Sequence, residues 1–251
     1  MTEVSVERLN RFYGAYDEET RLSRDNMHRV EFITTVHVLD REIPKGSKIL
    51  DVAAGVGKYA LYYAHKGHQV WAQDIVVAHV DRMRRIVQET GVTNVDVACG
   101  DARDLSRFED CVFDVVLCMG PIYHMADEQE RLDCLRESLR VLKPGGLLAV
   151  TYLNTAVERD PRFRDEVGGV RMDSCFFPST PESVAKMLDR LELSIQDHVA
   201  TDGFARQVRA LLNQFGEEEF GHWMDFHMKV CRRPVSFSYS YDGLFVCRKE
   251  E

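Results

Sequence analysis

The stretch that decides the fold is Lys48-Ile-Leu-Asp-Val-Ala-Ala-Gly-Val-Gly-Lys-Tyr-Ala60. Its first part, residues 49–52, is apolar apart from Asp51 and predicts a short strand that carries a carboxylate near its end. Gly55 and Gly57 follow, and glycine allows a tight turn and the close approach of a ligand to the backbone. Apolar residues then recur at helical spacing. A strand, a glycine loop and a helix in this order are typical of a nucleotide-binding βαβ unit.

A second predicted strand, residues 69–73, ends directly before Asp74. A carboxylate at this place accepts hydrogen bonds from the hydroxyls of a ribose, in NAD as in any other adenosine. The alternative is an ordinary surface acid at a strand end. The spacing Gly55-x-Gly57-x-x-Ala60 also satisfies the dinucleotide pattern. These residues predict a nucleotide site and leave the nucleotide open.

Composition bounds the class of protein. With 251 residues, 45% of them hydrophobic, the chain is long enough for one α/β domain with a large core. Its seven cysteines are scattered singly, which favours reduced thiols over a disulfide framework or a zinc site. The formal charge of −9 disfavours nucleic acid as a partner. Because no apolar run has membrane-spanning length and no leader-like segment begins the sequence, we expect a cytoplasmic monomer or homodimer without membrane contact.

The middle of the chain continues the α/β pattern. We expect strands at residues 95–98, 113–119 and 147–152, helices at about 77–91 and 128–142, and a break at 143–146. Gly100-Asp101-Ala102 follows the third strand, where an acid can bind an adenine amino group and a backbone amide can reach a ring nitrogen. Residues 119–125 follow the fourth strand, at the sheet edge where α/β proteins bind ligands.

Five segments, in order and spacing, resemble the class I S-adenosylmethionine-dependent methyltransferases. Within that class the chain is similar to the small-molecule type 11 group, which carries Gly-Pro-Leu-Tyr-His-Leu where this chain has Gly120-Pro-Ile-Tyr-His-Met125. The resemblance covers residues 47–152 closely and the flanks loosely. One departure is Ala53, where the family usually has glycine; alanine is small enough to keep the close approach. The five segments are 49–60, Asp74, 100–102, 113–125 and 142–147.

The resemblance implies a Rossmann-like, mostly parallel sheet of seven strands, with strand seven antiparallel, helices on both faces and a helical cap. It implies S-adenosylmethionine as cofactor, S-adenosylhomocysteine as product, and no metal. Asp51 would lie near the amino group of the cofactor, Asp74 would hold the ribose, and Ile75 would pack on the adenine. With Tyr13 added from the N-terminal helices, the expected cofactor contacts are Tyr13, Asp51, Ala53, Gly55, Gly57, Asp74, Ile75, Asp101, Ala102, Met119 and Gly120.

His124 and Tyr123 are the candidate catalytic residues. Methyl transfer is an in-line displacement, so the enzyme chiefly aligns the reactants and excludes water. A base is needed only when the acceptor must lose a proton, and an imidazole with a pKa near neutrality can take it. The alternative is that His124 only holds the loop or contacts the cofactor. The loop lacks the Asn/Asp-Pro-Pro-Tyr of methyltransferases that act on nucleic-acid bases, which again disfavours nucleic acid.

We expect one domain over residues 1–251. It would comprise an N-terminal helical cover at 1–45, a cofactor-binding core at 46–152, cap insertions at 153–180 and 201–236 that bind the acceptor, and a last strand at 237–251. The predicted function is methyl transfer to an oxygen, nitrogen or sulfur of a small molecule. The alternatives are an NAD-dependent oxidoreductase, which Asp51 and residues 100–102 disfavour, a non-catalytic S-adenosylmethionine-binding protein, and protein methylation.

Overall fold

A seven-stranded sheet forms the centre of the computed structural model, which describes residues 3–250 and the side chains from residue 6 onward. Its strand order is β3-β2-β1-β4-β5-β9-β8, and β9 runs antiparallel to both of its neighbours. This confirms the predicted Rossmann-like sheet with an antiparallel last strand. The strands are β1 Lys48–Asp51, β2 Gln69–Asp74, β3 Val95–Cys99, β4 Phe113–Met119, β5 Leu142–Leu153, β8 Leu193–Ala200 and β9 Asp242–Lys249.

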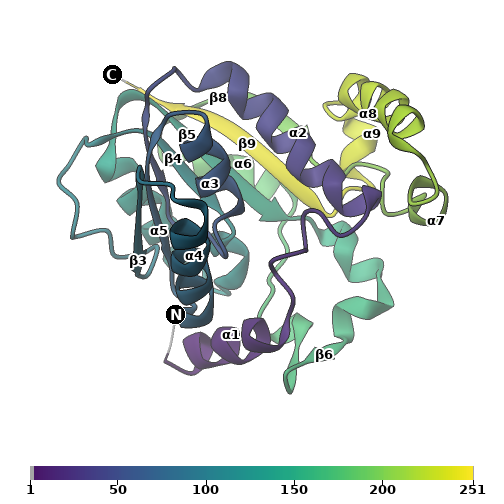
Figure 1. The fold of residues 1–251 in the computed structure, drawn as a ribbon, viewed down its shortest axis with the longest axis horizontal. Helices are drawn as coiled ribbons and strands as arrows, with labels where there is room; N and C mark the ends of the chain where they lie inside the picture. Colours follow the sequence, from purple (N-terminus) through teal and green to yellow (C-terminus); the bar gives the residue numbers. More distant parts are fainter. Residues whose placement is uncertain (1–2, 251) are drawn as a thin grey trace.

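Helices cover both faces of this sheet (Figure 1). Apolar side chains of α2, α3 and α4 pack on one face, and those of α5 and α6 pack on the other. Each helix buries one apolar side against the sheet, as an α/β architecture requires. The longer helices are α1 Glu3–Ala15, α2 Asn26–Glu42, α3 Lys58–His65, α4 Val77–Thr90, α5 Glu128–Val141, α6 Pro181–Asp189 and α8 Glu217–Val230.

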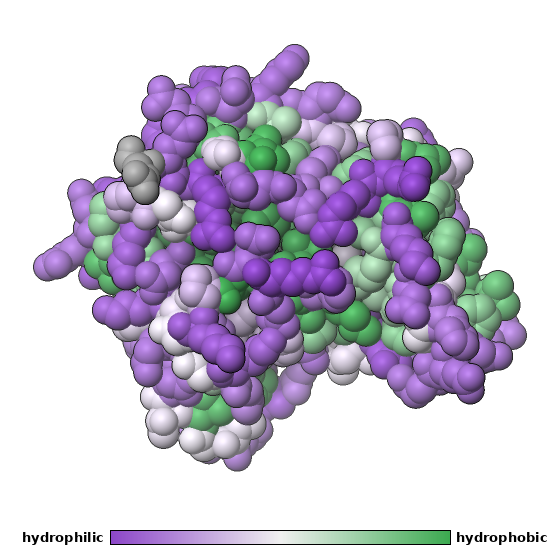
Figure 2. Space-filling model, turned by 90° about the horizontal axis from the view of Figure 1, so that it is seen from above, coloured by the Kyte–Doolittle hydropathy of each residue, from purple (hydrophilic) through white to green (hydrophobic). Residues whose placement is uncertain are grey.

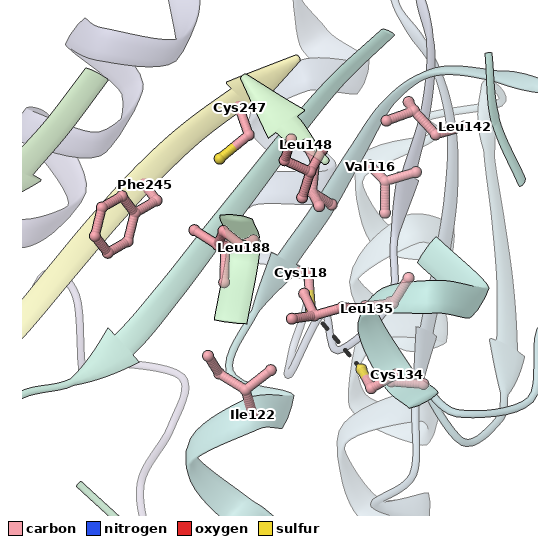
Figure 3. Packing of buried hydrophobic residues seen from close by; sticks show 14 of the residues in the cluster. Val116, Cys118, Ile122, Cys134, Leu135, Leu142, Leu148, Leu188, Phe245 and Cys247 are labelled. Carbon is pink, nitrogen blue, oxygen red and sulfur yellow. Dashed lines mark hydrogen bonds between the residues drawn. The ribbon is translucent and has the colours of Figure 1, made fainter. Parts of the chain in front are cut away.

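Figure 3 shows the core between the sheet and α5 and α6. Leu148 of β5 and Phe245 of β9 meet Leu188 of α6 there, all at most 2% exposed. The sulfur atoms of Cys118 on β4 and Cys134 on α5 lie 3.9 Å apart within this core, so they are thiols in contact. The cysteines thus serve as small apolar core residues, in keeping with the expected reduced state.

Two expectations about element boundaries are corrected. Residues 143–146 do not separate a helix from a strand: β5 begins at Leu142, and the extra residues form an irregularity opposite Phe113 and Val115 of β4. Apolar residues also recur at helical spacing over about residues 203–230, which predicts one helix, but this stretch is divided into turns, the short helix α7 Arg209–Leu212 and α8, and α9 Pro234–Phe237 follows. Gly216 is the N-cap of α8 and marks a break in the helical structure. The apolar residues keep their helical spacing across this break, so spacing alone does not reveal it.

The segments outside the sheet gather beyond the carboxyl ends of the parallel strands. In Figure 1, α1 lies beside a small hairpin made of β6 Glu166–Val167 and β7 Val170–Arg171. The 3₁₀ helices η1 Pro121–His124, η2 Thr155–Arg159, η3 Pro161–Arg164 and η4 Met172–Ser174 occupy the adjoining loops. Helices α7 and α8 pack instead on the first half of α2.

The helical insertion after β8 exposes apolar side chains. Leu211, Phe226 and Val235 are more than half exposed, and Figure 2 shows apolar surface at the right of the view, on the side of α7, α8 and α9. None of the helices within residues 3–250 is both long and apolar enough to cross a bilayer.

Candidate active site

Asp74, at the tip of β2, organises the glycine loop. Its Oδ2 accepts a hydrogen bond from the backbone N–H of Gly55 at 2.7 Å, and its Oδ1 accepts one from Val76 N–H at 2.8 Å. Gly55 has a φ of +56°, which glycine adopts without strain. The carboxylate thereby joins the tips of β1 and β2, and each of its oxygens keeps a second lone pair for a ligand.

A cavity opens at this edge of the sheet. It is lined by nine of the eleven predicted cofactor residues and by both candidate catalytic residues, brought together from β2, β4, α1 and the loops after the strands, including the loop after β1. We name it the first cavity. The predicted residues that line it are Tyr13, Ala53, Gly55, Asp74, Ile75, Asp101, Ala102, Met119, Gly120, Tyr123 and His124.

Asp51 and Gly57 are the two predicted contacts that do not line the first cavity. Gly57 has a φ of +92°, and a Cβ there would lie 2.8 Å from the side chain of Met83, so the glycine allows α3 to start close to α4. Asp51 is 1% exposed beneath the loop, and burial raises its pKa to about 8. Both residues shape the loop from behind it.

The loop after β3 supplies an edge of the first cavity. The carboxylate of Asp101 accepts three hydrogen bonds from the guanidinium of Arg103, at 2.6 to 3.2 Å, and burial raises the pKa of Asp101. The neighbouring Ala102 N–H has no hydrogen-bond partner within residues 3–250. A donor beside a carboxylate is the pair that an adenine edge requires.

His124 is held on both sides. Its Nδ1–H donates to the carbonyl oxygen of Cys175 at 2.7 Å, because a carbonyl only accepts; its Nε2 must then accept from the hydroxyl of Tyr13, at 2.9 Å. Burial lowers the pKa of His124 to about 4. Both ring nitrogens are hydrogen-bonded, so the neutral ring joins α1 to the loop before α6. This geometry favours the structural alternative. The general-base role of His124 remains a prediction.

Tyr123 differs from His124 because its hydroxyl is free. It has no hydrogen-bond partner within the described chain, and a Cβ at Gly120 would lie 3.5 Å from it. Gly120 has a φ of +134°, so the loop passes close to the tyrosine only because the residue is glycine. Tyr123 lines both this cavity and a second one beside it. The hydroxyl is thus available to a ligand in either space.

The segment between α1 and α2, residues 16–25, crosses the mouth of the first cavity, and we call it the strap. Arg21 donates to Glu18 at 2.7 Å and to Glu31 of α2 at 2.8 Å. Glu19 accepts two hydrogen bonds from Arg82 of α4, at 2.7 and 2.6 Å. The sequence alone does not pair these residues, since their partners lie on other elements.

A second cavity adjoins the first. Tyr13, Glu18, Arg21 and Tyr123 line both cavities, so the two spaces share a wall. Aromatic rings and arginines make up much of the remaining wall. These are Phe12, Tyr16, Phe163, Phe176, Tyr241, Arg24, Arg162, Arg206 and Arg209.

The first cavity fits the adenosine part of S-adenosylmethionine. Besides the free Ala102 N–H, the ring of His79 lines this cavity and is 5% exposed. Its Nδ1 lies 3.4 Å from Asp74 Oδ1, and its Nε2 has no hydrogen-bond partner within residues 3–250. Buried polar atoms normally have partners, so these indicate a polar ligand. Within the same residues, no cluster of three or more histidine, cysteine, aspartate or glutamate side chains could hold a metal ion.

Comparison with known proteins identifies a methyltransferase domain. A family model described as a methyltransferase domain matches residues 49–146. The chain is 30% identical over 208 residues to a sarcosine/dimethylglycine N-methyltransferase of Halorhodospira halochloris, covering 82% of this chain and 63% of that protein. It is 32% identical over 145 residues to a ubiquinone biosynthesis O-methyltransferase of Xanthomonas axonopodis pv. citri, covering 58% and 57%. Residues 49–146 therefore form a methyltransferase domain, and the chain is similar to methyltransferases over most of its length.

Solved structures share the fold at lower identity. The PH0226 protein from Pyrococcus horikoshii OT3 superposes with a TM-score of 0.63 at 20% identity, covering 94% of this chain and all of that one. The 4+2 cyclase SpnF gives a TM-score of 0.60 at 20% identity, covering 88% and 80%. The chain spans less than two thirds of the length of the first two curated relatives. A cyclase shares the fold, so the fold by itself does not define the reaction.

Proposed function

We propose that this protein transfers a methyl group from S-adenosylmethionine to a small-molecule acceptor. The observation that carries the proposal is the pair of adjoining cavities at the carboxyl edge of the sheet. One is lined by the residues that the family uses for its cofactor, and the other is large and lined by aromatic rings. Ligands bind at this edge in open α/β sheets.

Different residues of the chain would bind the cofactor, close the site and orient the acceptor. Asp74 would accept hydrogen bonds from the ribose hydroxyls, and Ala102 N–H with Asp101 would bind the adenine edge. Met119 and Gly120 would close the site, and Tyr13 would cover it. When bound, the cofactor supplies a methyl carbon activated by a positive sulfur. The strap excludes water, and Tyr123, at the shared wall, would orient the acceptor.

The acceptor would be a small molecule with an apolar body, and no metal would be required. The two curated relatives act on nitrogen and on oxygen by their names, so they leave the atom open. The described cysteines are all free, which supports a cytoplasmic location. The assignment to the type 11 group, and a monomeric or homodimeric state, are also proposals.

Calorimetric titration of the purified protein with S-adenosylmethionine, S-adenosylhomocysteine and NAD tests the cofactor. We expect micromolar binding of the first two and none of NAD. Binding of NAD alone would refute the proposal. Binding of the two sulfur compounds without methyl transfer to any of a broad set of amines, phenols and thiols would instead favour a cofactor-binding protein of another activity.

A further inference from the structure

Asp242 is a cavity-lining carboxylate whose side chain accepts no hydrogen bond within residues 3–250 and whose ion pair with Arg206 is long. It begins β9, opposite Leu153 at the end of β5, lines the second cavity and has a 15% exposed side chain. The nearest cation is Nη2 of Arg206, at 3.6 Å, and no donor within residues 3–250 is in hydrogen-bond reach. By contrast, Glu18 and Asp160 in the same wall each accept hydrogen bonds from an arginine.

The position of Asp242 is fixed from behind by Asp202. This carboxylate is 1% exposed and accepts hydrogen bonds from Ser240 Oγ at 2.5 Å, Tyr241 N–H at 2.9 Å and Asp242 N–H at 3.2 Å. It also accepts one from Arg206 Nε at 2.7 Å. Because a buried network of this kind is fully paired, it holds the start of β9 in one conformation. Asp242 is therefore presented to the cavity with its acceptor capacity unused.

The electrostatic surroundings of Asp242 favour a cation. Burial, followed by the charges of Glu31 and Asp202, raises the pKa of Asp242, and Arg206 and Arg21 act in the opposite direction. An entering positive charge would offset the excess of carboxylates and stabilise the ionised form of Asp242. The charged and titratable groups that face Asp242 from the surrounding elements are Glu31, Asp202, Arg21, Arg206, Tyr59, Tyr123 and Tyr152.

The rest of the wall suits an apolar body attached to that cation. The rings of Phe12 and Tyr16 stack with centroids 5.5 Å apart, and Phe176 meets Phe12 edge-on at 5.3 Å. Tyr241 lies under the guanidinium of Arg206, at 4.4 Å from the ring centroid. Aromatic walls with a few convergent polar groups are typical of sites for small organic ligands.

We propose that Asp242 binds the nucleophilic amine of the methyl acceptor and removes its proton, an inference that rests on the proposed function. The acceptor enters as an ammonium group; its N–H bond breaks, the proton passes to the Asp242 carboxylate, and nitrogen keeps the electron pair. That pair forms the bond to the methyl carbon as the carbon–sulfur bond breaks and its electrons go to sulfur. The methylated product leaves as a cation, and Asp242 returns its proton to solvent through the open cavity.

Binding of simple probes to the protein saturated with S-adenosylhomocysteine tests the proposal. Benzylamine carries the ammonium group on an aromatic body, and benzyl alcohol has nearly the same shape without the charge. We expect Asp242→Asn to weaken benzylamine binding by about tenfold or more, since a charge-assisted hydrogen bond is lost. Benzyl alcohol should bind weakly and equally to both proteins. The control is Asp197→Asn. Asp197 lies on β8, outside both cavities, and the substitution breaks its ion pair with Arg232.

A second measurement needs no variant. The affinity of the wild-type protein for benzylamine should fall as the pH is lowered, because the carboxyl of Asp242, whose pKa is raised by burial, becomes protonated while benzylamine stays charged. Unchanged benzylamine affinity in Asp242→Asn, no benzylamine binding by the loaded wild-type protein, or equal affinity across the whole pH range in which benzylamine is charged would each overturn the proposal. Failure of the wild-type protein to bind S-adenosylhomocysteine would instead refute the proposed function.

Discussion

Replacing Asp51 with asparagine should stabilise the protein, and by more at high pH. Asp51 is 1% exposed, and the only hydrogen bond recorded for its carboxylate within the described chain is a long one, 3.4 Å, from Ala53 N–H. An ionised carboxylate in such a place is poorly solvated and poorly paired, and Asp74 nearby adds repulsion. Burial accordingly raises the pKa of Asp51 to about 8.

The size of the effect follows from that pKa. Below about pH 4 the aspartate is protonated in both the folded and the unfolded chain, and the substitution changes the charge of neither. Between the ordinary pKa of 3.8 and about 8, the folded protein keeps a proton that the unfolded chain releases, so stability falls as the pH rises. The asparagine variant has no such dependence. Its advantage should grow to about 3 kcal/mol near pH 6 and about 6 kcal/mol above pH 8.

Urea unfolding of both proteins at several pH values measures this difference. Asp81→Asn, on the exposed side of α4, is the matched control and should be neutral throughout, since its carboxylate is about half exposed. A stability gain of equal size at every pH, or none at any, would show that Asp51 is not protonated in the folded protein and would refute the reasoning.

The remaining predictions concern the site directly. Asp74→Asn should weaken S-adenosylhomocysteine binding by about 30-fold or more, because the loop at Gly55 and the ribose both lose a charged acceptor; calorimetry measures it. His124→Gln should keep cofactor binding and turnover, with the pH–rate profile unchanged above about pH 5 because the ring is already neutral there; lost turnover with intact binding would restore the base role. Arg82→Gln should release S-adenosylhomocysteine a few-fold faster in stopped-flow experiments at low salt, an effect that high salt removes because the pair with Glu19 is exposed.

The sheet could be predicted because its signals are local. The parallel strands β1 to β4 are short, mostly apolar runs that end at or just before glycine or a carboxylate, and parallel topology places these loops at one edge. Asp74, Ala102 and Gly120 therefore come together without any knowledge of the side-chain packing. The same reasoning placed Asp51 and Gly57 in the site, and they lie behind it because a motif does not distinguish residues that touch a ligand from residues that shape the loop.

The contacts between distant segments could not be predicted. The bond between Tyr13 and His124 joins residues 111 positions apart, and the carbonyl of Cys175, 51 positions from His124, decides that the imidazole accepts through Nε2. Likewise Arg82 looks like part of a solvated helix face until Glu19 is seen against it. Nothing in the spacing of the chain identifies such partners, since they depend on how the N-terminal helices fold over the sheet.

The walls of the two cavities come from different parts of the chain. Similarity to known methyltransferases therefore bears on the cofactor more than on the acceptor. The first cavity is built largely from residues 49–146, the part that matches the methyltransferase domain. Of the residues that line the second cavity, Tyr123 alone belongs to that part; the others come from α1, the strap, α2, residues 153–176 and residues 206–242. Similarity over the domain therefore concerns the first cavity, while most of the wall of the second cavity comes from segments outside the matched domain. Asp242 lies at the border between the sheet and these segments. It is the residue that we propose binds the amine of this chain's acceptor.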